Sequence, residues 1–570
     1  MKRFLALALS LLMILGILLM AGCTNTGTSD DTTTGTKKPA GTTAGTTTAG
    51  TTAGTTEGTT TEGTTTEGTT TEGTTTEGAT NEGTTTEGTT TEGTTTEGTT
   101  TEGTTAGNTT ENTTAPIGGG DTPTGQDKMP GYEDIDFGGA VFKIVGCDGE
   151  ADGFNSAKEI YSEESDAISV SVRNRNQIVE LLYNCKIQGV ASASPAGDAA
   201  TEVTGNQHTI TLYTHHYAIT STATAGQAYN FMTIGSKEID FSQPWWDQQY
   251  VKSYTINNSQ AQPTLYSIVG DFALTTFDCT HALVYNKTVF QNEPKVNHIN
   301  MYQLVRDKKW TMDQFEYIVK NVAKDSNGDQ VYESLKGDVA GWIRTGHATH
   351  GLHVASGLSI IKNTNGVLTF DVDKNTETWS AVIDKSKALW ALPQGETLGY
   401  SDIPATLASG NACFASEILG SSLGNLKDYD AEIGLLPYPL HSETQENYAH
   451  YVDNHVYSYS IPTSWETPDA AADFLTVYAY ASRYIVRPTY INVYAYDYCA
   501  DEESAEMLDI ILSTMTYDPG YLSSTPNLEA DLSNMITNNK NNVAQFAARK
   551  AANANSWIST LIAGIDDNEV

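Results

Sequence analysis

The stretch GDFALTTFDCTHALVYNKTVF, Gly270–Phe290, decides the fold class, because ALVYNKTVF runs from a strand pattern directly into a helix pattern. The same alternation occurs elsewhere. AVFKIVG (Ala140–Gly146) reads as a short buried strand, and Asp166–Tyr183 as an amphipathic helix. The remaining predicted elements are a strand at HTITLYT (His208–Thr214) and helices at Thr311–Val322, Asp469–Tyr484 and Glu502–Met515. This alternation predicts α/β architecture with mostly parallel sheets.

The length of the globular part predicts two lobes. Residues 129–570 form a stretch of 442 residues with ordinary globular composition. One hydrophobic core rarely serves more than about 250–300 residues. We therefore expect two packed halves rather than one.

The N-terminus reads as a secretion signal with a lipid anchor. Lys2 and Arg3 precede an apolar run from Phe4 to Met20, and Ala21-Gly22-Cys23 follows. A charged start, an apolar centre and a small-residue cleavage site are typical of a signal peptide, here residues 1–22. A cysteine after the small pair resembles the lipobox of bacterial lipoproteins, which implies lipidation of Cys23 and attachment to the cell membrane through lipid alone. Ordinary secretion is the alternative.

Residues 23–128 read as a long disordered tether. They consist almost entirely of Thr, Gly, Ala and Glu, and a glutamate recurs every five residues from Glu57 to Glu102. Such a segment has little apolar surface to bury, so it cannot offset the entropy of folding.

The charge of the chain excludes several partners. The formal net charge is -38; residues 1–128 hold 15 acidic and 5 basic residues, which leaves -28 for residues 129–570. A surface this acidic repels nucleic acid and anionic lipid headgroups. It suits an extracellular domain.

Five cysteines remain beside Cys23, namely Cys147, Cys185, Cys279, Cys413 and Cys499. They form no CxxC pair and no metal-ligand spacing. A disulfide between Cys147 and Cys185 is one option in an oxidising compartment.

Six segments carry a family resemblance, in this order along the chain: IDFSQPWWD (Ile239–Asp247), GDFALTTFDCTHALVYNKTVF (Gly270–Phe290), LVRDKKWTMDQF (Leu304–Phe315), KDSNGDQVY (Lys324–Tyr332), IGLLPYPLHSETQENY (Ile433–Tyr448) and YSYSIPTSWETPDAAADFL (Tyr457–Leu475). Together they resemble the extracellular solute-binding proteins of ABC importers, in the family that includes sugar and oligosaccharide binders.

The resemblance implies a two-lobed Venus-flytrap fold with the ligand held between the lobes. One crossover is expected near Asp271–His281 and the return near Tyr451–Tyr457. Lobe 1 would then hold about 139–270 plus 457–500, and lobe 2 about 271–456 plus 501–565. The expected partners are a small carbohydrate ligand and ABC permease subunits.

Four residues are the first candidates for ligand contact. Trp245 and Trp246 offer a flat aromatic platform for a sugar ring, although adjacent residues on an extended segment point opposite ways and either ring could pack in the core. Asp271 and Asp278 flank the expected first crossover and could accept sugar hydroxyls, or could bond nearby backbone amides.

Three further candidates come from lobe 2. Arg344 follows Trp342 at a predicted strand end and could hold a hydroxyl or pair with an acid. His347 begins a run of three histidines at spacing three, which does not match a three-ligand zinc site on a helix. Glu417 precedes the GSSLG segment, Gly420–Gly424, and is expected to face the cleft.

The segment DSNGDQVYE resembles a calcium loop. Asp325, Asn327 and Asp329 stand at alternate positions and Glu333 lies beyond them. Gln330 replaces the glycine expected at the sixth position, and the twelfth position carries no glutamate. A turn rich in Asx residues is the alternative, and no other cofactor is expected.

The leading interpretation is a non-catalytic protein that binds a carbohydrate and delivers it to an importer. The GSSLG segment also fits G-x-S-x-G, so an esterase with Ser422 as nucleophile, or a carbohydrate-active hydrolase, is the second hypothesis. A ligand sensor or adhesin without a permease is the third.

Overall fold

The computed structural model describes residues 124–567 except 150–153, 216–223, 454, 495–498, 500, 523–527 and 539–541. The predicted signal peptide, Cys23 and the tether as far as residue 123 lie outside the described residues. The side chains of residues 421–423 and 425 lie outside them too, which includes the hydroxyl of Ser422.

Lobe 1 is built on a four-stranded sheet in the order β14-β3-β1-β2. Its strands are β1 (Ala140–Cys147), β2 (Cys185–Ser192), β3 (Leu212–His215) and β14 (Ser458–Ser460). β1 runs parallel to β2 and β3, whereas β14 returns from far along the chain and lies antiparallel to β3.

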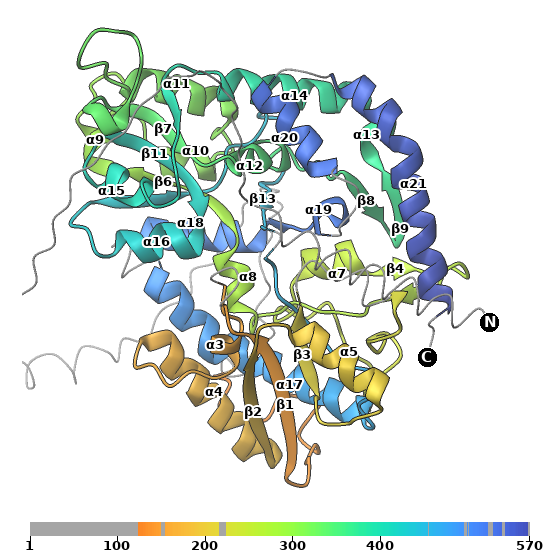
Figure 1. Ribbon diagram of the computed structural model, residues 1–570. Helices are drawn as coiled ribbons and strands as arrows, with labels where there is room; N and C mark the ends of the chain where they lie inside the picture. Colours follow the sequence, from red (N-terminus) through yellow and green to blue (C-terminus); the bar gives the residue numbers. More distant parts are fainter. Residues whose placement is uncertain are drawn as a thin grey trace, which may run out of the picture. The chain divides into compact units, whose positions relative to one another are not determined.

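Two long helices cover this sheet, α4 (Ala167–Tyr183) and α17 (Pro468–Asn492), and they pack on each other (Figure 1). α4 begins where expected, because the Asp166 carboxylate accepts a hydrogen bond from the Ser169 amide at 2.9 Å. Phe142 of β1 stacks on Phe474 of α17 with 4.1 Å between ring centroids. The apolar sides of helix and sheet therefore form one core.

Lobe 2 contains a five-stranded sheet in the order β10-β7-β11-β6-β12. Its strands are β10 (Gly395–Thr397), β7 (Ala340–Arg344), β11 (Ala412–Ile418), β6 (His281–Asn286) and β12 (Ile433–Leu436). β10, β7 and β11 are parallel, but β6 is antiparallel to both β11 and β12. The prediction of mostly parallel sheets is wrong for this lobe, because β6 enters from the crossover and starts against the end of β11.

The remaining elements have the following bounds: α3 (Ala157–Ile160), α5 (Pro195–Gly205), α7 (Gln248–Tyr254), β4 (Ile256–Asn257), β5 (Pro263–Thr264), α8 (Leu274–Asp278), α9 (Lys287–Gln291), α10 (Met301–Arg306), α11 (Met312–Val322), η1 (Ser334–Lys336), α12 (Ala348–Val354), β8 (Ile361–Thr364), β9 (Val367–Phe370), α13 (Asp371–Lys374), α14 (Thr376–Trp390), α15 (Ile403–Ala408), α16 (Leu419–Leu426), β13 (His450–Tyr451), α18 (Glu502–Ser513), β15 (Met515–Thr516), α19 (Pro519–Leu522), α20 (Leu528–Asn538) and α21 (Val543–Asp567).

Two chain segments join the two sheets, and we call them the hinge strands: residues 276–280 and residues 450–457, of which 454 lies outside the described residues. Thr280 and Val452 form an antiparallel bridge, and the Asp453 amide donates to the Cys279 carbonyl at 2.9 Å. β13 pairs in parallel with β15. Two sheets joined by paired crossovers make the two-lobed α/β fold that was predicted. The lobe boundaries at single-residue level stay a prediction.

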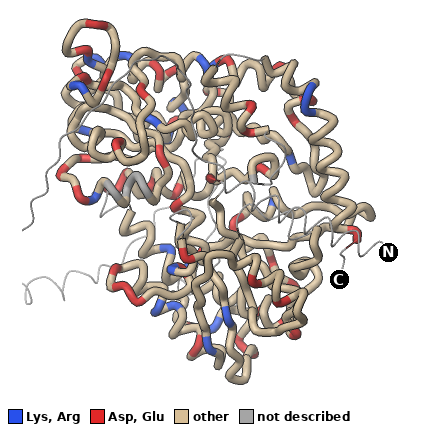
Figure 2. The backbone as a smooth tube through the Cα atoms, viewed as in Figure 1, with Lys and Arg blue, Asp and Glu red and all other residues tan. Residues whose placement is uncertain are grey.

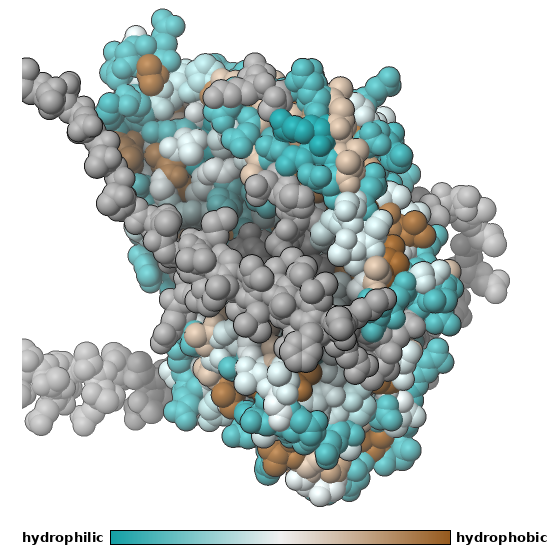
Figure 3. All heavy atoms as spheres, turned by 45° about the vertical axis from the view of Figure 1, so that its right-hand side comes forward, coloured by the Kyte–Doolittle hydropathy of each residue, from teal (hydrophilic) through white to brown (hydrophobic). Residues whose placement is uncertain are grey.

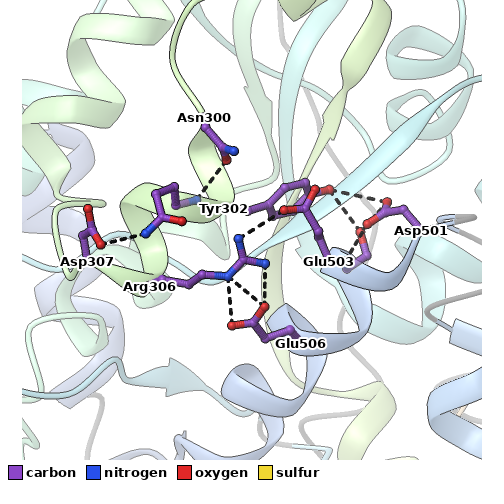
Figure 4. Close-up of polar contacts among 9 residues, drawn as sticks. Asn300, Tyr302, Arg306, Asp307, Asp501, Glu503 and Glu506 are labelled. Atoms are coloured by element: carbon purple, nitrogen blue, oxygen red, sulfur yellow. Dashed lines mark hydrogen bonds and ion pairs between the residues drawn. The ribbon is translucent and has the colours of Figure 1, made fainter.

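α18 packs on β12 of lobe 2. Arg306 of α10 bonds Glu506 through Nε and Nη2, at 2.9 and 2.6 Å from Oε2, and contacts Glu503 at 3.1 Å (Figure 4). Asp501 caps the helix by accepting from the Ser504 amide at 2.6 Å. These charged contacts hold α18 against α10, which precedes it by about 200 residues in the chain.

A second contact between the lobes lies away from the hinge strands, and we call it the clasp. The Asn363 side-chain amide, at the β8–β9 hairpin, donates to the carbonyls of Ser253 and Thr255 at 3.0 and 2.8 Å. The Asn257 amide donates to the Gly366 carbonyl at 2.9 Å. Gly366 has a φ of +86°, and a Cβ there would meet the Asn257 side chain at 2.2 Å.

The surface is acidic and mostly hydrophilic. Figure 2 shows Asp and Glu spread over the described part of the chain. In Figure 3 the apolar side chains on the visible face form separate small spots. Among the described residues, no helix is long and apolar enough to cross a bilayer.

The five described cysteines are all buried thiols. The Cys147–Cys185 disulfide is therefore wrong. The parallel register pairs Ala140 with Cys185 and Cys147 with Ser192, so the two cysteines lie at opposite ends of β1 and β2.

Candidate functional site

A buried carboxylate surrounded by histidines lies where the hinge strands meet the lobe 2 sheet. Asp453 is 5% exposed, and its Oδ2 lies 3.9 Å from Nε2 of His281 and 3.6 Å from Nδ1 of His347. Its Oδ1 accepts a hydrogen bond from Nδ1 of His455. We call these four residues the Asp453 cluster.

The fold explains why these residues meet. His281 is the first residue of β6 and pairs with Ile418, the last residue of β11. His347 follows the end of β7 and precedes α12. The bridge between the hinge strands brings Asp453 beside this edge. The cluster thus stands at the carboxyl ends of the parallel strands β7 and β11, where α/β proteins place ligand sites.

Asp453 and His347 each shift the pKa of the other. Burial raises the pKa of Asp453, but the three imidazoles outweigh burial and lower it well below its usual range. In return Asp453 raises the pKa of His347. His281 is fully enclosed, and burial lowers its pKa despite Asp453.

Several buried polar atoms around the cluster lack a hydrogen-bond partner among the described residues. They are Oε2 of Glu417 and Nδ1 of both His281 and His350. Glu417 is 3% exposed and lies beside His281 in the sheet, opposite Ala282. Burial raises the pKa of the Glu417 carboxyl to about 7. Orphaned polar atoms are costly, so a group of them at a strand end points to a ligand.

The outer side of the cluster is open to solvent. The His347 side chain is 46% exposed, and its ring lies 6.0 Å from that of Tyr400, which is 51% exposed. Glu529 approaches Nε2 of His350 at 3.4 Å. Phe154 of lobe 1 stacks on His455 with 4.7 Å between centroids. Phe154 of lobe 1 and Tyr400 of lobe 2 thus each contact a histidine of the Asp453 cluster.

The tryptophan pair lies elsewhere. Trp245 and Trp246 are 6% and 3% exposed. Trp245 packs edge-on against Tyr480, with 5.4 Å between centroids, and Trp246 lies 6.3 Å from Phe272. The structure places both rings in the lobe 1 core, and their contact with a ligand stays a prediction.

Asp271 and Asp278 flank the first crossover and bond residues of α17. Asp271 lies 3.2 Å from Nη1 of Arg483 and 3.5 Å from Nη1 of Arg487. Asp278 accepts hydrogen bonds from Tyr490, at 2.9 Å, and from Tyr494. These carboxylates thereby fix the crossover to lobe 1 in the structure described.

Arg344 is packed rather than extended toward solvent. Its guanidinium lies 4.4 Å from the Trp342 ring and 4.2 Å from the Trp390 ring, and Nη2 donates to the Trp390 carbonyl at 2.7 Å. Burial lowers its pKa to about 9. Of the predicted ligand residues, the structure brings only His347 and Glu417 to the Asp453 cluster.

The predicted calcium loop is folded on its own side chains. Asp325 accepts from the amides of Gly328 and Gln330 at 2.6 and 2.7 Å, and Asn327 and Asp329 each accept from the amide two residues on. Glu333 pairs with Lys336 at 2.7 Å. Among the described residues, no group of three or more His, Cys, Asp or Glu side chains could hold a metal ion. Calcium binding stays a prediction.

Sequence reasoning missed Asp453 and Glu529, and it considered His281 only as the end of a crossover. The available signal was DNHVY, where an acid and a histidine stand two residues apart on the expected return crossover. Burial and pairing with β6 could not be read from that spacing.

No protein-family model and no curated protein matches the chain. Solved structures do match. A cyclic α-maltosyl-1,6-maltose binding protein from Arthrobacter globiformis is 8% identical, covers 74% of this chain and 99% of its own, and has a TM-score of 0.49. A family 1 extracellular solute-binding protein from Bifidobacterium longum subsp. infantis is 14% identical, with coverages of 74% and 100% and a TM-score of 0.45. An ABC substrate-binding protein from Listeria monocytogenes in complex with cycloalternan is 12% identical, with coverages of 74% and 99% and a TM-score of 0.43.

Proposed function

We propose that this chain is an extracytoplasmic solute-binding protein that captures a carbohydrate, specifically an oligosaccharide, and delivers it to an ABC importer. The observation that carries the proposal is the set of buried, unpartnered polar atoms on Glu417, His281 and His350 beside the hinge strands. Binding, without chemical change of the ligand, is the activity proposed.

Sugar hydroxyls suit these atoms chemically. A hydroxyl both donates and accepts, so it can donate to Oε2 of Glu417 and either donate to or accept from an imidazole. Each buried polar atom that gains a partner removes a desolvation penalty of about 1–3 kcal/mol. The aromatic rings of Tyr400 and Phe154 lie at the same site and can cover the apolar C–H faces of a sugar.

The hinge strands supply the coupling to transport. Asp453 and His455 belong to a hinge strand, whereas His281, His347 and Glu417 belong to lobe 2 and Phe154 to lobe 1. A ligand that touches all three binds one relative arrangement of the lobes better and shifts the population toward it. A permease can then distinguish the loaded form by shape.

Lipid anchoring through Cys23 is part of the proposal. The motif at Ala21-Gly22-Cys23 supports it. Expressed with its leader in a bacterium, the wild type is expected in the membrane fraction and Cys23→Ser in the soluble fraction. Equal partitioning of both would remove the anchor from the proposal.

Titration calorimetry tests the binding function. Wild type is expected to bind at least one of a panel of neutral and amino oligosaccharides. His281→Gln should weaken that binding about tenfold or more, with its circular dichroism unchanged. Absence of heat and of thermal shift across sugars would sink the proposal.

A further inference from the structure

We propose that the ligand carries a protonated amine, which binds at the mouth of the site among Asp453, Glu417 and Glu529. This inference rests on the proposed function and narrows its ligand to an amine-bearing, hydroxyl-rich molecule such as an amino-sugar oligomer. The geometry of the three carboxylates carries it.

All three carboxylates interact with His347, whose side chain is 46% exposed. Nδ1 of His347 lies 3.6 Å from Asp453, and the His347 charge also interacts with Glu529 and Glu417. Glu529 lies 3.4 Å from Nε2 of His350. The basic partners of Asp453 and Glu529 in these two contacts are imidazoles, which carry at most a fractional charge near neutral pH.

Glu417 gives the independent indication of a ligand. Its Oε1 accepts from the Ile418 amide at 3.0 Å, whereas Oε2 is buried without a partner in the described part of the chain. A neutral hydroxyl would satisfy the hydrogen bond but leave the buried charge uncompensated. An ammonium group does both, and charge-assisted hydrogen bonds are about twice as strong as neutral ones.

The negative charge at the site also excludes anionic ligands. The Arg344 guanidinium lies against the rings of Trp342 and Trp390 and donates to the Trp390 carbonyl. An anionic sugar would therefore meet three carboxylates with only imidazoles to offset them, and repulsion would exclude it.

The pH dependence of ligand binding tests the inference separately from the affinity at a single pH. The groups facing His347 are Asp453, Glu417, Glu529, His281, His350 and Tyr400. Below the raised pKa of His347 the imidazolium already compensates the carboxylates, and an amine must compete with that proton. Above it the imidazole is neutral and Glu417 is ionised, so both changes favour an ammonium group as the pH rises from about 6 to 7, whereas at higher pH a sugar amine itself loses its proton.

Calorimetry with chain-matched ligands tests this. Glucosamine oligomers, N-acetylglucosamine oligomers and cello-oligomers of the same length are titrated at pH 6 and pH 7. The glucosamine oligomer is expected to bind at least tenfold more tightly than either neutral oligomer at pH 7 and to release protons on binding. Glu417→Gln and Glu529→Gln should each abolish most of this preference, whereas the matched control Glu316→Gln, on the exposed face of α11, should retain it.

Each outcome decides between the proposals. If the neutral oligomers bind as tightly as the amine, the amine inference is wrong and sugar capture stands. If spermidine or a lysine-rich peptide binds and no sugar does, the amine site stands and carbohydrate capture falls. If neither amines nor sugars bind, both proposals fail.

Discussion

At the scale of single residues, Asp453 of the hinge strand contacts three histidines, two of which belong to lobe 2. It is buried, yet it stays ionised because three imidazoles approach it. Buried charges persist only when they are paired, and removal of one member leaves the others uncompensated. The pKa of His347 and the pKa of Asp453 should therefore depend on each other.

Asp453→Asn tests this coupling. Without the carboxylate, the pKa of His347 is expected to fall toward or below its ordinary value, and an NMR pH titration of the histidine ring protons measures the change. In the wild type the raised pKa of His347 stabilises the fold fully below about pH 6.5, and this contribution disappears as the pH rises through the folded pKa. Asp453 acts oppositely, since its lowered pKa stabilises the fold above about pH 4 and the benefit fades on acidification. An unchanged His347 titration in the variant would contradict the coupling.

Arg344→Ala should affect stability more than binding. The guanidinium fills the space between two tryptophan rings and bonds a carbonyl. Loss of this packing and of the cation–π contacts should lower the free energy of unfolding by about 2–3 kcal/mol, measured by urea denaturation. A variant of full stability that no longer binds ligand would instead place Arg344 in the site.

Two residues predicted from the sequence, His347 and Glu417, lie at the candidate site, and their contact with a ligand stays a prediction. The sequence could not identify Asp453 or His281, whose proximity depends on the bridge between hinge strands 170 residues apart. Trp245 and Trp246 illustrate the converse. Their flat aromatic rings suit contact with a sugar, but in the structure they are buried against Tyr480 of α17 and Phe272 of the crossover. These partners lie elsewhere in the chain, so the local sequence could not predict the burial.

At the scale of elements, helix starts were the most predictable feature. Asp166 and Thr311 cap α4 and α11, and their side chains accept from Ser169 and Gln314 as the capping pattern requires. These bonds span three residues, so the sequence alone specifies them. Strand direction in lobe 2 was not predictable, because the orientation of β6 depends on the edge at which the chain enters the sheet.

Gly351→Ala tests how α12 positions the histidines. A Cβ at Gly351 would lie 2.4 Å from the Tyr438 ring, so the helix carrying His350 must shift. We expect a loss of about 2 kcal/mol in unfolding free energy and weaker ligand binding. The matched control is Gly424→Ala in α16, where no atom lies within 4 Å and the change should be neutral or stabilising by up to about 1 kcal/mol. Equal stability of the two variants would show that α12 is not tightly docked.

At the scale of the whole molecule, the clasp should constrain motion between the lobes. Asn363→Asp keeps the shape and removes both donors to the Ser253 and Thr255 carbonyls. Hydrogen exchange of the β8–β9 amides is expected to accelerate about tenfold, because two interlobe bonds worth about 1 kcal/mol each are lost. Asn321→Asp, which breaks a bond within α11, is the control and should leave those amides unchanged. Unchanged exchange in Asn363→Asp would mean that the clasp contributes no constraint.

The clasp and the hinge strands together have a mechanical consequence. The hinge strands and the clasp attach the lobes to each other at two separate places. A line through the two attachments is an axis about which one lobe can rotate relative to the other, whereas other rotations and translations are restricted. The relative movement of the two halves is thereby reduced to one principal rotation. A ligand at the Asp453 cluster, which lies beside one end of that axis, would be enclosed by a rotation through a small angle. The edges of the lobes farthest from the axis would move the most, so a partner protein that contacts them could sense the rotation.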